Sequence, residues 1–166
     1  MPCSCFARTA IGETLAEKIN NCKCSCGARF VVEENGRRFQ IQGTVENVDK
    51  IKVDGCLCSD QQTKKCDYLF IYKNGDVKLY VFVELKGKNI ETAIKQLVST
   101  IEIFCSEGIL NSANLKAFIV SSKYPSHDST YRSRKAKFEK LFSRYRAEIR
   151  QKNNSILYNP ITNSIS

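Results

Sequence analysis

The strongest hydrophobic pattern in the chain is a pair of apolar runs at 68–72 and 79–83. Both runs are rich in Tyr, Phe, Val, Leu and Ile, which favour strands, and they flank the turn signal Asn74-Gly75-Asp76. This pattern predicts a β-hairpin. Because each run is apolar at consecutive positions, we expect the hairpin to be buried on both of its faces.

Shorter segments with strand-like patterns surround this hairpin. An alternating pattern at 29–32 and 38–44, interrupted by Asn35-Gly36, predicts a second hairpin with residues such as Phe39 on one face. Residues 50–53 fit either a short strand or a loop. Two more strands are predicted, at 117–121 and at 156–161.

Three segments show the 3.6-residue period of amphipathic helices. The first is 10–20, and the second begins after Asn89, a suitable N-cap, and ends near Gly108. The third is 131–152, where the apolar stripe consists of Phe138, Leu141, Phe142, Tyr145 and Ile149. A polar loop is expected at 122–130.

The order of these elements predicts the fold class. A chain of 166 residues favours one domain. Helix, strands, central hairpin, helix, strand and helix in this order indicate a single α/β domain, 1–166, with a mixed central β-sheet flanked by helices. We place the core of the domain at about 10–121, followed by a basic C-terminal helix at 131–152.

The positive charge of the chain is concentrated in that last helix. The formal net charge is +9, yet 131–152 alone holds nine Lys or Arg residues against two acidic ones. Such a block suits a polyanion, nucleic acid first and an acidic membrane surface second; a merely solvated helix face is the alternative. The membrane is disfavoured because the apolar stripe is needed to cover the core. The expected phosphate-binding residues are Arg132, Arg134, Lys135, Lys137, Lys140 and Arg144.

Charged side chains enter the apolar hairpin at one end. Glu84 and Lys86 end the second strand two residues apart, so they share a face of the strand, whereas Leu85 points away from them. Asp67 begins the partner strand. A loop from Asn74 to Val77 would pair Asp67 with Glu84, and a two-residue turn would make them diagonal neighbours. Either register brings the three charged residues together.

Two buried carboxylates repel each other and are costly to desolvate. Mg²⁺ relieves this cost, because it binds one or two carboxylates together with waters and phosphate oxygens. Lys86 could then orient or deprotonate a water, or stabilise charge in the transition state. The alternative is a Glu84–Lys86 or Asp67–Lys86 pair that only satisfies itself, or a strand end that reaches solvent.

The string Cys66-Asp67, followed after seventeen residues by Glu84-Leu85-Lys86, resembles the signature of the PD-(D/E)xK, or restriction-endonuclease-like, nuclease superfamily. The predicted elements over about 10–121 also resemble its α-β-β-β-α-β core, and Cys66 replaces the proline of the motif. The resemblance implies that Asp67, Glu84 and the Leu85 backbone carbonyl hold Mg²⁺ or Mn²⁺. It also implies that Lys86 serves the attacking water.

Members of this superfamily often use further residues, and the resemblance suggests where they would lie here. Glu17, or else Glu13, on the first helix would complete the metal site, and Gln96 would be an accessory residue on the helix after Lys86. For each of these, a solvated helix position is the alternative. Asp54 is a further acidic candidate, with a turn aspartate as the alternative.

Nine cysteines are a second unusual feature of the composition. An odd number without a secretory signal argues against a disulfide scaffold. A structural Zn²⁺ site is one interpretation, and an iron–sulfur cluster or free thiols are the alternatives. The candidate zinc ligands are Cys3, Cys5, Cys22, Cys24 and Cys26.

Together these features lead to one functional hypothesis. We expect a Mg²⁺-dependent endonuclease that hydrolyses phosphodiester bonds, in DNA rather than RNA, in defence, restriction, recombination or repair. The alternatives are a non-catalytic nucleic-acid-binding or regulatory module with a nuclease-like fold and a zinc-stabilised interaction protein. Because no apolar run of about 18 residues occurs, we expect a cytoplasmic protein without a membrane partner. A homodimer is compatible with these features.

Overall fold

The computed structural model describes residues 12–24, 29–58, 62–110, 113–122 and 129–166. Three α-helices, a 3₁₀ turn (η1) and nine strands are found in these residues. In chain order they are α1 (Leu15–Asn21), β1 (Val31–Glu34), β2 (Arg37–Ile41), β3 (Val48–Lys52), β4 (Tyr68–Asn74), β5 (Val77–Lys86), α2 (Ile90–Ser106), β6 (Asn114–Ser121), α3 (Ser129–Leu141), η1 (Ser143–Tyr145), β7 (Glu148–Asn153), β8 (Ser155–Asn159) and β9 (Ser164–Ile165).

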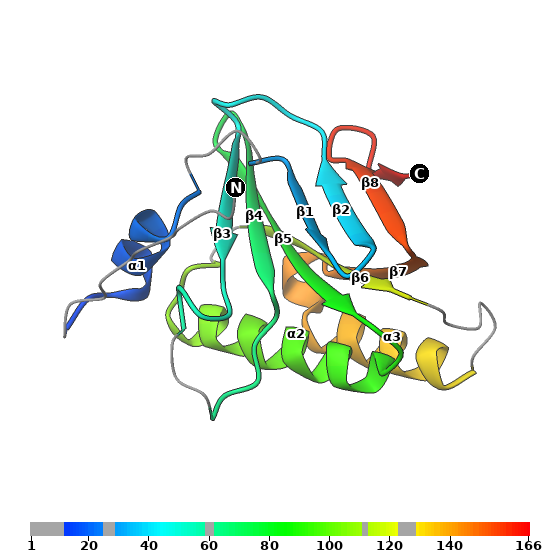
Figure 1. Ribbon diagram of the computed structural model, residues 1–166. Helices are drawn as coiled ribbons and strands as arrows, with labels where there is room; N and C mark the ends of the chain where they lie inside the picture. The colour runs from blue at the N-terminus through cyan, green and yellow to red at the C-terminus, as the bar shows by residue number, and fades with distance from the viewer. Residues whose placement is uncertain (1–11, 25–28, 59–61, 111–112, 123–128) are drawn as a thin grey trace.

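The described elements form three layers (Figure 1). The central layer is a mixed five-stranded sheet in the order β3-β4-β5-β6-β7. Helices α2 and α3 cover one face of it, and a four-stranded sheet in the order β1-β2-β8-β9 covers the other. The α/β class is therefore confirmed. The single central sheet expected from the sequence is instead two sheets, because β8 pairs in parallel with β2 and extends the first hairpin.

The predicted central hairpin is the β4–β5 pair, and its register is the first of the two alternatives. Asn74 pairs with Val77 and Tyr68 with Val83, so the same register places Asp67 opposite Glu84. Gly75 adopts a φ of 59°, which lets the chain reverse between the strands. In the β1–β2 hairpin, Asn35 and Gly36 both have positive φ, as a two-residue type I′ turn requires.

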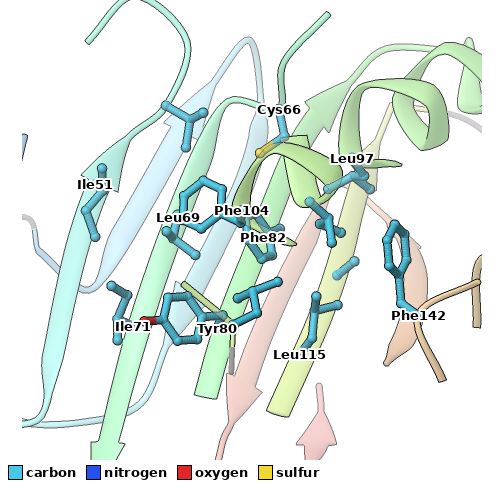
Figure 2. Packing of buried hydrophobic residues seen from close by; sticks show 14 of the residues in the cluster. Ile51, Cys66, Leu69, Ile71, Tyr80, Phe82, Leu97, Phe104, Leu115 and Phe142 are labelled. Atoms are coloured by element: carbon cyan, nitrogen blue, oxygen red, sulfur yellow. The ribbon is translucent and has the colours of Figure 1, made fainter. Parts of the chain in front are cut away.

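The hairpin is buried on both faces, as predicted. One face packs on α2 through residues such as Phe82, whose ring lies 5.2 Å from that of Phe104 in a T-shaped arrangement. Figure 2 shows this side, with Leu69 and Tyr80 beside the same rings. The opposite face packs on the second sheet, which is the four-stranded sheet of β1, β2, β8 and β9. Both sides of β5 are therefore dry, and only its ends reach the surface of the molecule.

Phe39 on β2 joins the two sheets. Its side chain is fully buried, and its ring centroid lies 5.4 Å from that of Phe70 and 5.2 Å from that of Phe118. Phe118 in turn lies 4.7 Å from Tyr158. This aromatic cluster holds the β1–β2 hairpin against the central sheet, and so it fixes where the tip of that hairpin lies.

Two helix predictions need correction. The helix predicted at 131–152 ends at Leu141, and the 3₁₀ turn η1 that follows has its C-cap at Arg146, which has a φ of 50°, before β7 begins. Ile149 fitted the helical stripe, yet it is fully buried on β7, which pairs in parallel with β6. The pairing satisfies backbone groups that an edge strand would leave open, and this gain outweighs helix periodicity.

The first helix begins later than predicted. Thr14 caps it by accepting from the Glu17 amide, while the Glu17 carboxylate accepts from the Thr14 amide. Gly12, with a φ of 97°, lies outside the helical region, so a helix cannot run back from Leu15 through it. Residues 50–53 resolve in favour of a strand, because β3 forms one edge of the central sheet. Among the described helices, none is long and apolar enough to cross a membrane.

We expect Phe39→Ala to destabilise the protein by about 3–5 kcal/mol, because it removes the ring that fills the space between the two sheets. Urea unfolding followed by circular dichroism measures this change. Ile161→Ala, at a side chain that is 78% exposed, is the control and should change the free energy of unfolding by less than about 0.5 kcal/mol. Equal effects of the two substitutions would contradict the role assigned to Phe39.

Candidate active site

The candidate site lies at the carboxyl end of β5, where several elements of the central layer end or begin. β5 and β6 run parallel and finish side by side, with Lys86 paired to Ser121. The helices that follow them, α2 and α3, begin near this same edge. In α/β sheets ligands bind beyond the carboxyl ends of the strands, where helix N-termini also favour anions.

Asp67 meets β5 through the backbone. Its Oδ2 accepts a hydrogen bond of 2.7 Å from the Leu85 amide. The N–H and C=O of one strand residue point to the same edge, so the Leu85 carbonyl also faces the side of the strand on which Asp67 lies. The backbone pairing of β4 with β5 ends at Tyr68 and Val83, and this side-chain contact joins the two segments beyond that pair.

Glu84 is the most deeply buried charged side chain of the site. Its side chain is only 2% exposed, and its Oε1 lies 4.0 Å from the Lys86 Nζ. The other carboxylate oxygen, Oε2, is buried and has no hydrogen-bond partner within the described part of the chain. A buried polar atom of this kind costs free energy unless a further group satisfies it.

Both carboxyl groups hold their protons more tightly than usual. Burial, and after it the charge of Asp67, raises the pKa of Glu84 from 4.5 to about 9, against the opposing effect of Lys86. Burial also raises the pKa of Asp67 from 3.8 to about 6, although the hydrogen bond from Leu85 lowers it. A pair with this behaviour lacks sufficient positive charge nearby, and a divalent cation would supply it.

Lys86 is held by the helix that follows it. Its Nζ donates to the Gln96 Oε1 over 2.9 Å, and the Gln96 Nε2 donates to the Lys65 carbonyl over 2.8 Å. One turn further along α2, the Thr100 hydroxyl accepts from the Cys66 amide over 2.8 Å. Gln96 and Thr100 therefore tie the chain before Asp67 to α2, and Gln96 also sets the direction of the Lys86 side chain.

The carboxylates of Asp67 and Glu84, with the Leu85 carbonyl, form a donor set suited to Mg²⁺ or Mn²⁺. Hard cations prefer oxygen ligands, and Mg²⁺ commonly keeps water or phosphate oxygens at its other positions. The orphan Glu84 Oε2 fits a ligand role. No cluster of three or more His, Cys, Asp or Glu residues arranged for a metal occurs in the described residues.

Two further acidic residues lie near this pair. The charges of Glu34 and Asp54 both raise the pKa of Asp67. Glu34, at the end of β1, accepts a hydrogen bond of 3.1 Å from the Tyr68 hydroxyl. Asp54 was a candidate from the sequence, but Glu34 was not. It belongs to a hairpin that only the packing of the second sheet brings over the end of β4, so no local pattern identifies it.

The predicted first-helix carboxylates have other partners. Glu17 is exposed and completes the capping box with Thr14. Glu13 accepts a hydrogen bond of 3.0 Å from the Asn21 side chain. Neither carboxylate is among the main causes of the raised pKa values of Asp67 and Glu84. Gln96, in contrast, contacts Lys86 as described above.

The predicted basic residues divide into two groups. Lys135 binds Glu139 and the Ile149 carbonyl, and Arg134 lies 3.1 Å from Glu91 on α2, so the charges of both are used within the fold. The others are exposed and make no ion pair within the described ranges of the chain. They are Arg132, Lys137 and Lys140 on α3 and Arg144 on η1, where it lies over the Tyr145 ring.

A hollow of about 390 Å³ lies between the first turns of α2 and α3, next to the end of β5. The side chains around it are mostly polar or basic. They include Lys88, Asn89, Tyr131 and Arg134.

Only two of the five candidate zinc ligands, Cys22 and Cys24, lie within the described residues. Cys3, Cys5 and Cys26 lie outside the described residues. Cys24 is disulfide-bonded and so offers no free thiolate to a zinc ion. The Cys22 Sγ lies 2.8 Å from the Sγ of Cys56, which is not one of the candidate ligands. The structural zinc site therefore stays a prediction.

Comparison of the chain with protein-family models, with curated proteins and with solved structures gave no match. The chemistry assigned to these residues therefore rests on their own geometry. The strongest part of that geometry is the buried Glu84 next to the half-buried Asp67 and Lys86.

Without divalent metal, the protein should lose stability as the pH rises from about 5 to 9. The folded state keeps protons on Glu84 and Asp67 that the unfolded chain releases near pH 4, because both folded-state pKa values are raised. Each such proton contributes a slope of at most about 1.4 kcal/mol per pH unit. Urea unfolding in a chelator at several pH values measures the slope.

Glu84→Gln is the matched variant, since it keeps the shape of the side chain and cannot ionise. Between pH 7 and 9, its free energy of unfolding should depend less on pH than that of the wild type, because Glu84 is the member of the pair with the higher pKa. Parallel profiles for the two proteins would show that Glu84 does not carry the raised pKa.

Proposed function

We propose that this protein is a metal-dependent endonuclease that hydrolyses phosphodiester bonds in nucleic acid, with DNA as the favoured substrate. The observation that carries this proposal is the buried Glu84, with an unsatisfied carboxylate oxygen, beside Asp67 and 4.0 Å from the Lys86 ammonium. Acidic groups and one amine at an open strand end form an arrangement suited to phosphoryl chemistry. The resemblance of the motif to PD-(D/E)xK nucleases agrees with it.

In this proposal Asp67, Glu84 and the Leu85 carbonyl would hold Mg²⁺ or Mn²⁺. A bound divalent cation polarises a phosphate oxygen and lowers the pKa of a water molecule. Lys86 would orient the attacking water or stabilise the charge that develops on the phosphate. Gln96 is a positioning residue, because its contact with the Lys86 Nζ keeps the ammonium directed along this edge.

The exposed cations of α3 and η1 would hold the phosphate backbone. α3 begins at the same edge of the central sheet as the candidate site, and Arg134 lies beside Glu91 in the first turn of α2. A nucleic acid that follows α3 towards its first turn would therefore arrive near Lys86. Phosphate contacts of this kind position a substrate without reading its sequence.

The wild type should cleave DNA in Mg²⁺ or Mn²⁺ and lose this activity in a chelator. Glu84→Gln and Lys86→Ala should each lower the cleavage rate at least about 100-fold, because each removes a group that acts at the reacting phosphate. Cleavage of plasmid and branched DNA, resolved on gels, measures these rates.

Glu33→Gln is the control for these variants, because Glu33 is an acidic residue on β1 of the second sheet and forms an ion pair with Arg38. It should leave the cleavage rate unchanged. Salt-sensitive DNA binding without any cleavage would favour the alternative of a nuclease-like binding module. Cleavage that survives in Glu84→Gln would remove the site assignment.

The affinity for a DNA duplex should fall steeply with salt, and part of that dependence should come from α3. The double variant Arg132→Gln/Lys137→Gln should reduce the slope of log K against log salt by up to about 0.9 for each phosphate that the variant no longer neutralises. Fluorescence anisotropy at several salt concentrations measures this slope.

The matched double variant replaces two lysines outside α3, Lys18→Gln/Lys78→Gln, and carries the same change in net charge. It should leave the slope close to that of the wild type. If both double variants shift the slope equally, net charge rather than the face of α3 governs binding.

A further inference from the structure

The tip of the β1–β2 hairpin places a positive charge over the end of β5. Arg37 is the first residue of β2 and lies on the same face as Phe39, because side chains alternate along a strand. Phe39 points between the two sheets, so Arg37 also faces inward, at the rim of that interface. It lies on the second-sheet side of the central layer, opposite to α2.

Arg37 contacts the two parallel strands just beyond their ends. Its Nη1 donates to the Ser122 hydroxyl over 3.0 Å. The same atom lies 3.8 Å from the position that a Cβ would occupy on Gly87, the residue after Lys86. The Ser122 amide donates a hydrogen bond of 2.9 Å to the Gly87 carbonyl. The guanidinium therefore lies against two strand ends that are hydrogen-bonded to each other.

The charge of Arg37 is not balanced by an acidic side chain among the described residues. Glu34, its partner across the hairpin, accepts from the Tyr68 hydroxyl instead. The Arg37 Nε is buried and has no hydrogen-bond acceptor. The adjacent Arg38 differs, because it points outward and lies 3.1 Å from Glu33. Within the described part of the chain, Arg37 therefore has a buried donor without an acceptor and no acidic partner.

A phosphate group is the ligand that fits these features. The guanidinium is a planar fork of donors that matches phosphate oxygens in pairs, and it stays charged at every relevant pH. Lys86 and the exposed Lys88 lie on either side of Gly87 in the chain, so two further cations occur at this strand end together with the acidic side chains described above. A carboxylate ligand would suit the fork as well, but a nucleic acid bound at the candidate site carries a phosphate at every nucleotide.

We propose that Arg37 binds a backbone phosphate next to the scissile one, so that the second sheet supplies part of the substrate-binding surface. Lys86 contacts Gln96 of α2 and Glu84 lies on the same face of β5, whereas Leu85 points into the core between the sheets. Arg37 therefore approaches the strand end from the opposite face and does not reach the reacting phosphate. This inference rests on the proposed function.

The test compares Arg37→Gln with Arg38→Gln, two adjacent arginines that face opposite sides of the same strand. Each is placed in a Glu84→Gln background, which prevents cleavage, and titrated against a short fluorescein-labelled DNA duplex in a chelator at several salt concentrations. Arg37→Gln should weaken binding roughly tenfold and reduce the salt slope by about 0.9, whereas Arg38→Gln should change neither.

Arg37→Lys separates the charge from the shape of the guanidinium. It should keep the salt slope and lose part of the affinity, because an ammonium cannot form the paired contact. Urea unfolding of all variants supplies the readout for a structural role. If Arg37→Gln lowers stability but binds the duplex as tightly as Arg38→Gln does, or if no duplex binding occurs, the inference is wrong.

Cleavage kinetics in the otherwise wild-type protein distinguish this inference from the proposed function. Arg37→Gln should raise KM and leave kcat unchanged, because Arg37 would bind its phosphate equally well in the substrate complex and in the transition state. Cleavage with unchanged KM would overturn the inference and leave the nuclease assignment standing. If DNA binding depends on Arg37 but the wild type cleaves no DNA, the phosphate-binding role of Arg37 stands and the nuclease assignment is overturned.

Discussion

The burial of the Glu84 carboxylate is the constraint on which the rest of this site depends. An acid held in a dry environment beside a second acid is unstable as an anion, and the single ammonium 4.0 Å away balances it only in part. The burial of apolar side chains on both faces of β5 offsets this cost in free energy. In the proposed function, a cation that arrives from solvent would relieve this cost, so the packing that destabilises the metal-free anion would favour metal binding.

The layers around β5 each contribute a different part of the edge. The central sheet provides Asp67, Glu84 and Lys86, and α2 holds the last of these through Gln96. The second sheet contributes by packing, since the aromatic contacts of Phe39 carry the tip of its hairpin to the same edge. A site assembled from three layers is sensitive to their relative positions, so its geometry depends on core residues that lie far from the charged groups.

Much of this arrangement could be predicted from local patterns. The doubly apolar runs identified β4 and β5, the turn signals identified both hairpins, and a two-residue spacing placed Glu84 and Lys86 on one face. The errors came from segments in which local and long-range preferences disagree. Ile149 fits a helical stripe equally well, but β6 offered an open edge, and pairing with it buried the side chain and satisfied its backbone. The capping box of Thr14 and Glu17 is a contact that spacing along one helix did not predict.

The sequence by itself determined the hairpin and the residue types that its end would hold, because alternation and burial act over a few neighbouring positions. Only the tertiary structure decided which distant groups join them. Glu34 and Arg37 reach this edge because the second sheet packs on the first, and Gln96 reaches Lys86 because α2 crosses back over β5. Such contacts depend on how whole layers bury apolar area against one another. That free energy is summed over the entire core, and no short stretch of sequence contains it.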